Sequence, residues 1–323
     1  MNISTQIMGN WTLKAILGGL VVFVLAAISI TGQTRPAPSA DEIAVRAAQQ
    51  RGQYINEFKD LLSRETKTYE EFDKNGRVRS TRAIVSTFIV YQSPLTGRIG
   101  EFRNVVSVDG KSVENADKRA EEFFTEIAGG GESAREWERI EKEGSRFDGS
   151  VSINGLTLFQ AAVLADNIRP SFKFTVNAME HLDGRPVYLL AYEQVRDTRY
   201  ISMDPKLMVN DGKPELVYDI DVPEGFTARV AGKFWIDQET FQARKEERRV
   251  FLQAPGGSTQ AIAVETVLVY QESPFSILTP KRFIFTQFRK PRNGEAARKE
   301  TSIMFSYDNF TRPDVEVKGA VKN

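Results

Sequence analysis

The pattern of apolar and polar positions predicts a chain built mostly from β-strands. Segments rich in β-branched and aromatic residues recur along it, as is typical of strands with at least one buried face. The predicted strands span residues 77–91, 172–182, 186–195, 216–220, 228–237, 241–252, 261–271, 281–288 and 301–307.

Three dipeptides between or beside these segments indicate tight turns. They are Asn-Gly at residues 75–76 and Asp-Gly at residues 109–110 and 183–184. These residue types accept a positive φ at little cost, and two-residue turns built from them join antiparallel strands. The sequence therefore predicts hairpins at these points and a sheet that is mostly antiparallel.

A few segments show helical spacing instead. Ser39 and Glu42 form a capping box, so a helix should follow to about residue 63 and lie on the sheet. Its apolar face is formed by Ile43, Ala47, Tyr54, Phe58 and Leu62. Further helices are predicted over residues 115–127, 133–144 and 157–166.

These elements predict an α+β fold. We expect a strongly curved antiparallel sheet, an incomplete β-barrel, with helices packed on its concave face. Residues 41–323 should form a single domain, with a helical insertion at about residues 115–144.

The N-terminal segment has the order of an export signal. Lys14 precedes an apolar run over residues 15–30, which is shorter than the roughly 20 residues of a spanning helix. We expect a signal peptide over residues 1–33 and a linker over residues 34–40. The mature protein would then be periplasmic or secreted. The alternative is an uncleaved anchor in the inner membrane, which would be the protein's one membrane contact.

Composition narrows the range of functions. The chain has 323 residues, with 43 basic and 43 acidic side chains, so it lacks the basic excess of most nucleic-acid binders. No nucleic-acid partner is therefore expected. The cysteine count is zero, which excludes disulfides, thiol nucleophiles and cysteine-ligated metals.

The strand pattern resembles a known superfamily. The segment at residues 232–241 is similar to the central hairpin of the periplasmic lipoprotein carriers (LolA/LolB-like), and residues 305–310 are similar to their closing strand. Residues 103–111 and 157–174 resemble more closely a group of exported bacterial proteins. The superfamily resemblance implies a half-barrel around helices and an apolar cavity that accepts acyl chains. The helical insertion departs from that pattern.

Aromatic residues recur at a period of two and supply candidates for such a cavity. Stripes of this kind are usually core, but in a half-barrel the core and the ligand cavity share the concave surface. Within one strand, Phe234 and Ile236 face opposite to Trp235. The residues predicted to line the pocket are Phe172, Phe174, Trp235, Phe283 and Phe285.

Two charged groups add polar candidates. Arg196, Arg199 and Tyr200 follow a strand end and could bind an anionic headgroup as a polar rim, or form a local salt-bridge network with Asp197. The strand at residues 241–252 carries charges on both faces. This pattern favours an edge strand protected against aggregation, with a polar groove as the alternative.

The sequence offers little support for catalysis. His181 is the single histidine, and no nucleophile-elbow, phosphate-loop or dinucleotide motif is present. Asp219 and Asp221 would share a face in a strand and could hold a metal or act as acid and base, but solvated edge positions explain them better. We therefore predict no catalytic residue, metal or cofactor.

The first expectation is a non-enzymatic binding or carrier protein for a lipid, an acylated molecule or another apolar ligand. An envelope interaction or scaffold protein with a solid core is the alternative. A hydrolase that uses carboxylates or a metal comes third.

Overall fold

A computed structural model describes residues 37–59, 61–92, 99–128, 138–139, 142–149, 151, 153, 157, 161–209, 212–256, 260–275, 277–289 and 297–312. The described residues from Pro38 onward belong to one compact unit, Pro38–Asn323. The expected signal peptide lies outside the described residues. Among the described helices, none combines the length and the apolar character needed to cross a bilayer.

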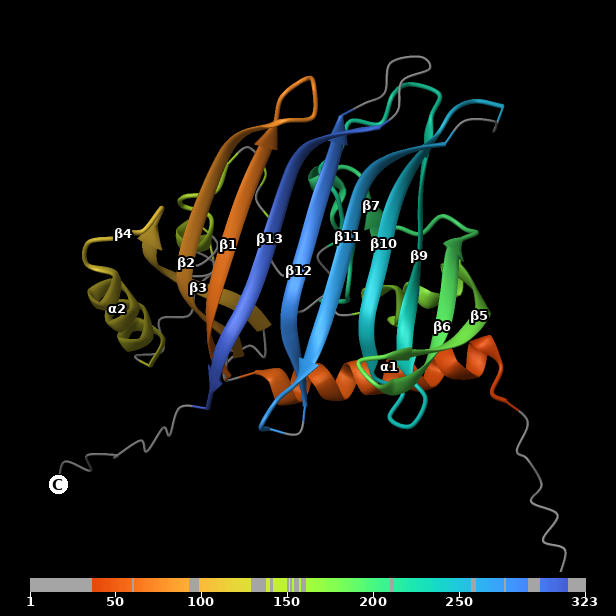
Figure 1. Ribbon diagram of the computed structural model, residues 1–323, viewed down its shortest axis with the longest axis horizontal. Helices are drawn as coiled ribbons and strands as arrows, with labels where there is room; N and C mark the ends of the chain where they lie inside the picture. The colour runs from red at the N-terminus through yellow and green to blue at the C-terminus, as the bar shows by residue number, and fades with distance from the viewer. Residues whose placement is uncertain are drawn as a thin grey trace, which may run out of the picture. The chain divides into compact units, whose positions relative to one another are not determined.

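Pro38–Asn323 is dominated by one antiparallel sheet of eleven strands (Figure 1). Their order is β4-β3-β2-β1-β13-β12-β11-β10-β9-β6-β5, so β4 and β5 form the two edges and the sheet is not closed. The strands are β1 (Leu62–Phe72), β2 (Val78–Gln92), β3 (Ile99–Val108), β4 (Lys111–Ser112), β5 (Phe172–Leu182), β6 (Arg185–Gln194), β9 (Thr227–Asp237), β10 (Ala243–Gln253), β11 (Gln260–Glu272), β12 (Leu278–Arg289) and β13 (Arg298–Thr311).

The three predicted hairpin turns are confirmed. Gly76, Gly110 and Gly184 have φ values of 77°, 76° and 79°, in the region that glycine adopts most easily. Each turn lies between strands that pair antiparallel, β1 with β2, β3 with β4 and β5 with β6. A second, parallel pair is formed by β7 (Ile201–Ser202) and β8 (Leu216–Val217).

The long N-terminal helix α1 (Ala40–Phe58) starts where the capping box predicts. The Ser39 hydroxyl accepts a hydrogen bond from the Glu42 backbone N–H at 3.2 Å. The helix ends at Phe58 rather than near residue 63, because residues 62–72 pair with β13 and β2 as β1. The described helical segments also include α2 (Ala116–Ala128), residues 138–139 and 142–144, and the 3₁₀ turns η1 (Ala162–Leu164), η2 (Arg169–Ser171) and η3 (Pro205–Leu207).

Parts of the predicted helical regions lie outside the described residues. Residues 133–137, 140 and 141 of the helix predicted over 133–144 are not described. The same holds for residues 158–160 of the helix predicted over 157–166. The described part of the segment at residues 157–166 contains the 3₁₀ turn η1.

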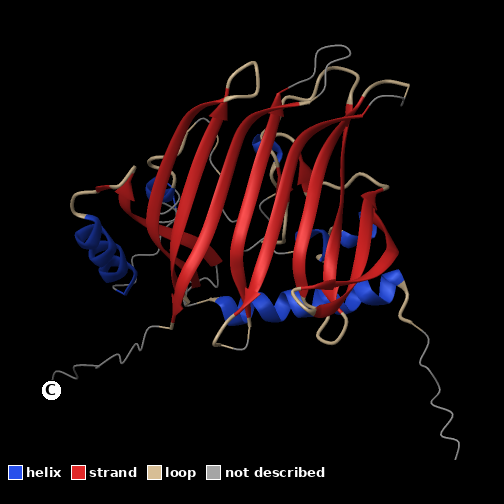
Figure 2. Cartoon of the chain, viewed as in Figure 1, coloured by secondary structure: helices blue, strands red, loops and turns tan. Residues whose placement is uncertain are grey.

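The sheet has a covered face and an exposed face. Figure 2 shows α1 running crosswise to the strands near one of their ends. The covered face, called the inner face here, carries Phe234, Phe283 and Phe305, all fully buried. It packs against α1 and against non-strand segments that include Tyr200, and these contacts form two large apolar clusters.

The prediction that residues 241–252 form an edge strand is wrong. The strand β10 lies between β9 and β11 in the interior of the sheet. Its charged residues Arg244, Glu246 and Arg248 point to the inner face and are buried. Their charges form contacts within the protein and do not protect an exposed edge.

Candidate functional site

The inner face carries a layer of aromatic rings on β5, β6 and β9. The ring of Tyr192 lies 5.7 Å from that of Phe172, 6.4 Å from that of Phe174 and 4.8 Å from that of Phe234. Phe172 and Phe174, both predicted pocket residues, therefore share one face and contact a common neighbour. Their side chains are buried under neighbouring residues in this arrangement.

A second group of rings continues this layer on β11, β12 and β13. The ring of Phe283 lies 5.4 Å from that of Tyr270 and 5.6 Å from that of Tyr307. Phe285, on the same face of β12, is partly buried and packs against both apolar clusters. The structure therefore brings four of the five predicted pocket residues to one surface.

Trp235 lies on the opposite, outer face and does not belong to this layer. Its ring lies 4.8 Å from the Lys233 ammonium and 4.1 Å from that of Lys245. Its indole Nε1 donates a hydrogen bond to Glu180 at 3.1 Å. The alternation of side chains along a strand explains this placement, because Phe234 takes the inward position.

One glycine makes room for the aromatic layer. A Cβ at Gly232 would collide with the backbone oxygen of Glu247 and with the hydroxyl of Tyr192. The missing side chain lets the Tyr192 hydroxyl reach Glu246, to which it donates a hydrogen bond at 2.7 Å. Gly232 therefore positions a buried tyrosine against a buried carboxylate.

A first buried ion-pair network lies under β1 and β3. The Arg103 guanidinium donates to both oxygens of Glu65, at 2.7 and 3.0 Å, and contacts Glu101 at 2.7 Å. Glu101 also accepts hydrogen bonds from the backbone and the hydroxyl of Thr157. Burial by itself would raise the pKa of Glu101, but Arg103 and Thr157 outweigh it and hold this pKa below its usual value.

A second buried charged group lies under β10. Arg248 Nε approaches Glu246 Oε1 at 3.2 Å, and both side chains are buried. Glu246 Oε2 has no hydrogen-bond partner in the described part of the chain. Burial raises the pKa of Glu246, and the opposing effects of Arg248 and Tyr192 only reduce that shift. The burial of Glu246 and Arg248 was not predicted from the sequence, although the alternation of charged residues over positions 244–248 indicates it.

A small hollow lies between α1 and the inner face. Its volume is about 10 Å³, enough for about one water molecule, and Arg51 and Tyr54 line it from α1. The Tyr54 ring meets the Tyr270 ring edge-on at 6.0 Å. Both hydroxyls are buried and have no hydrogen-bond partner among the described residues. The complete lining is Ala47, Gln50, Arg51, Tyr54, Gln242, Ala243 and Leu278.

The predicted polar rim is assembled in part. Arg199 donates a hydrogen bond to the Tyr200 hydroxyl at 2.8 Å and lies 4.9 Å from its ring centre. Lys213 approaches the same hydroxyl at 3.4 Å. Arg196 is exposed, and its backbone N–H donates to the Ser171 carbonyl. Arg199 and Tyr200 thus lie together.

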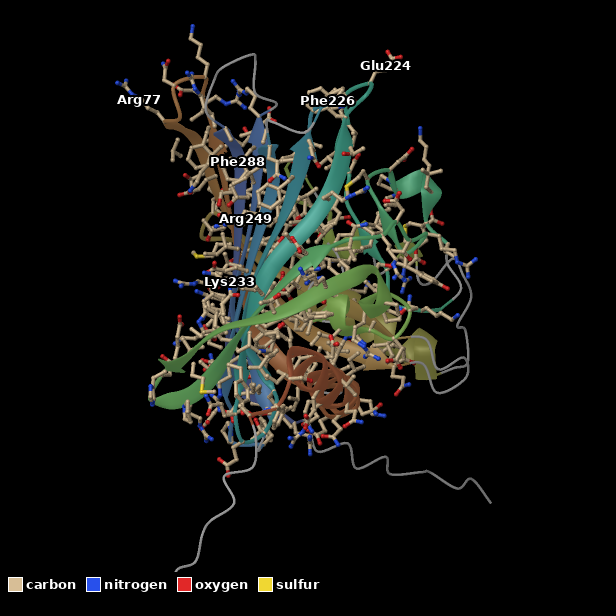
Figure 3. The ribbon with its side chains drawn as sticks, turned by 90° about the vertical axis from the view of Figure 1, so that its right-hand side faces the viewer. Arg77, Glu224, Phe226, Lys233, Arg249 and Phe288 are labelled. Atoms are coloured by element: carbon tan, nitrogen blue, oxygen red, sulfur yellow. The ribbon has the colours of Figure 1, made fainter. Side chains whose placement is uncertain are left out.

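The outer face carries a groove lined in part by Glu247, Arg249 and Phe251 of β10, the strand for which the sequence offered a polar groove as the alternative to a sheet edge. Its volume is about 460 Å³, and its lining includes Lys173, Glu193, Lys233 and Arg249. Figure 3 shows Lys233 and Arg249 on the side of the sheet away from α1. The small side chains of Ala191 and Ala231 leave space between these longer side chains.

The residues considered for catalysis, Asp219, Asp221 and His181, do not form a common site in the structure. Asp219 and Asp221 are exposed and follow β8 in a segment without regular structure. His181 is exposed at the end of β5, next to its turn. Within the part of the chain that the structure describes, no three acidic or histidine side chains gather as metal ligands would.

No protein-family model matches the sequence. No curated protein matches it either. Three solved structures show similarity at low identity. For a DUF1329 family protein from Desulfovibrio piger the TM-score is 0.35 and the identity 10%, over 87% of this chain and 95% of that one.

For a domain from Vibrio parahaemolyticus described as an outer membrane lipoprotein-sorting protein, the TM-score is 0.35 and the identity 10%, over 84% and 92% of the two chains. For a LolA superfamily protein from Nitrosomonas europaea the values are 0.32 and 11%, over 86% and 96%. Similarity of this size carries no conclusion about function. The similar structures do include members of the superfamily that the sequence pattern resembles.

Proposed function

We propose that this chain is a non-enzymatic carrier that works outside the cytoplasm and holds a lipid or another apolar ligand between α1 and the sheet. One observation carries the proposal. The inner face of an open sheet bears adjoining aromatic layers, and in the described part of the chain these layers are covered by α1 and by segments between the strands that include the small β7–β8 pair.

The attachment of α1 explains how the layer could open. The helix is held by side chains, and it shares no backbone ladder with the sheet. Its buried contacts come from Ile43, Ala44, Ala47, Tyr54 and Phe58. Moving α1 therefore breaks no strand pairing. The hollow of about 10 Å³ beneath it is too small for an acyl chain, so ligand entry requires this movement.

The carrier proposal can be tested by linking α1 covalently to the sheet. Ala47 and Ala243 line the same hollow from α1 and β10, and the natural chain has no cysteine. In Ala47→Cys/Ala243→Cys, we expect an oxidised disulfide, or a short bis-maleimide cross-link, to reduce binding of the neutral apolar dye N-phenyl-1-naphthylamine at least tenfold. Dye fluorescence is the measurement, and non-reducing electrophoresis confirms the link.

The two single-cysteine variants are the controls and should bind the dye as the wild type does. Reduction of the disulfide should restore binding. Equal binding by the linked and unlinked forms would show that the ligand does not enter beneath α1. Absence of dye binding by the wild type would contradict the carrier proposal itself.

The outer groove favours a second candidate, an envelope interaction protein with a filled interior. Its lining mixes Lys233 and Arg249 with Glu193 and Glu247, which suits a polar surface on another protein. A wild-type protein that binds no dye would favour this candidate over the carrier.

A further inference from the structure

One end of the sheet is strongly basic, although the whole chain has no net charge. This basic end is defined as residues 71–80, 289 and 298–300, and it lies at the end of the strands away from α1 (Figure 1). Six of its side chains are cationic: Lys74, Arg77, Arg79, Arg289, Arg298 and Lys299. We propose that the basic end docks on a membrane surface that carries anionic lipid headgroups. The inference goes beyond ligand carriage, because it assigns a surface outside the space beneath α1.

Direct contacts join the two halves of the basic end. The Arg298 guanidinium donates a hydrogen bond to the Lys74 backbone carbonyl at 2.8 Å, which links the start of β13 to the turn between β1 and β2. The Lys299 ammonium lies 5.9 Å from the centre of the Phe72 ring, at the end of β1. Arg289 is the ladder partner of Arg298, so β12 adds its charge beside that of β13. The cations therefore form one continuous surface.

The basic end contains three carboxylates, and each of them already has partners. Glu71 accepts a hydrogen bond from Arg79 at 2.6 Å, and Glu300 lies 3.8 Å from Arg289. Asp73 accepts hydrogen bonds from backbone N–H groups of its own turn. Among the described residues, no carboxylate forms an ion pair with the other four cations, which are Lys74, Arg77, Arg298 and Lys299. The basic end therefore keeps an excess of positive charge.

Acidic residues elsewhere at this end of the sheet lie too far away to cancel that excess. Asp221 and Glu224 precede β9, and β9 is five strand-to-strand steps from β1. At about 4.8 Å for each step the separation is about 24 Å. Charges in water are largely screened beyond the Debye length, which is about 8 Å at physiological ionic strength. Figure 3 likewise shows Arg77 and Glu224 on opposite sides of this end.

The basic end also presents apolar surface, which favours a membrane over an acidic protein as the partner. Val78 is 50% exposed and lies between Arg77 and Arg79 in the chain. Phe72 and Phe288 are partly buried beside the cations. Basic side chains near a bilayer are attracted to anionic headgroups, and an apolar side chain among them can enter the boundary with the acyl region. An acidic protein surface would match the cations but not the exposed valine.

A fluorophore placed at Val78 tests the contact in the full chain. The natural chain has no cysteine, so Val78→Cys can be labelled with the environment-sensitive fluorophore NBD at that position alone. We expect its emission to rise at least twofold with phosphatidylcholine vesicles that contain phosphatidylglycerol, and to stay unchanged with vesicles of phosphatidylcholine alone. The matched control is labelled Met179→Cys on the edge strand β5, where the methionine is 61% exposed, and its emission should not rise.

Two charge variants of labelled Val78→Cys locate the attraction. Lys74→Gln/Arg77→Gln should raise the lipid concentration at half-maximal emission at least tenfold, because each basic residue near an anionic surface contributes roughly a factor of five. Lys111→Gln/Lys281→Gln removes the same charge from exposed positions on β4 and at the start of β12. This control variant should stay within twofold of the unsubstituted labelled protein.

Several results would overturn the proposal. No rise in emission at position 78 with the anionic vesicles would exclude the contact, and it would leave the carrier proposal to its own test with N-phenyl-1-naphthylamine. An equal rise at positions 78 and 179, or with both kinds of vesicle, would show a contact that is not directed by the basic end. Equal weakening by the two charge variants would show attraction by the overall charge of the protein.

Discussion

The two buried charged groups under the sheet differ in how completely their atoms are paired. Under β1 and β3, Arg103 contacts both Glu65 and Glu101, and Thr157 supplies further hydrogen bonds to Glu101. Under β10, Glu246 has one oxygen without a hydrogen-bond partner among the described residues. Both groups are equally buried, so burial does not explain the difference.

This difference separates a structural role from a binding role. A buried network stabilises a unique arrangement when every member is satisfied, and a partly satisfied network leaves polar atoms that a ligand or water can use. The Tyr270 hydroxyl, which has no hydrogen-bond partner among the described residues, lies on the side of Glu246. We infer that the Arg103 network holds the sheet together, while the region around Glu246 is open to function.

The largest expected effect comes from breaking the satisfied network. Arg103→Met leaves Glu65 and Glu101 buried together without their common cation, so the free energy of unfolding should fall by about 3–5 kcal/mol. In Arg248→Met, Glu246 is left alone but can take up a proton, since burial already raises its pKa. That loss should be about 1–3 kcal/mol.

Urea unfolding at pH 7, followed by circular dichroism, measures both losses. Equal losses, or a greater loss for Arg248→Met, would contradict the distinction between the two groups.

An intermediate effect is expected in the pH dependence of stability. Arg103 and Thr157 hold the pKa of Glu101 below its unfolded value, so its contribution is present above the unfolded pKa and is lost as pH falls through the folded pKa. Burial raises the pKa of Glu246, so its contribution is present below the unfolded pKa and is lost as pH rises through the folded pKa.

The variants Glu101→Gln and Glu246→Gln should therefore differ from the wild type with opposite slopes. As pH rises from below 4, the wild type should gain stability relative to Glu101→Gln and lose it relative to Glu246→Gln. Urea midpoints measured between pH 3 and pH 8 give both differences. Slopes of the same sign would contradict the assignment.

The smallest effect is expected near the turn that joins β1 to β2, at the end of β1 and the start of β2. Arg79 contacts Glu71 at 2.6 Å, but the Arg79 side chain is 68% exposed. Exposed pairs contribute about 0–1 kcal/mol. Glu71→Gln should therefore change the free energy of unfolding by less than about 1 kcal/mol in the same assay. A loss comparable to that of Arg103→Met would show that burial is not what distinguishes these pairs.

The limits of the sequence are clearest in β1 and β10. In both strands the inward positions are occupied by charged residues, such as Lys67 on β1 and Glu246 on β10. A charged residue normally indicates a solvated position, so the start of β1 and the central place of β10 were missed. Their partners, such as Asp148 for Lys67 at 2.6 Å, are far away in the sequence. The region beneath α1 could not be predicted for the same reason, because Arg51 and Tyr270 are far apart in the sequence and are brought together by the packing of α1.

The sequence by itself determined the local features of this protein. Asn-Gly and Asp-Gly turns, the Ser39 cap and the alternation of aromatic residues act within a few residues, and they predicted the hairpins, the start of α1 and four residues of the aromatic layer. Only the tertiary structure decided which charges are buried, where β10 lies in the sheet and which polar groups border α1. These outcomes depend on contacts between residues distant in the chain, and on whether those contacts offset the loss of water around each charge.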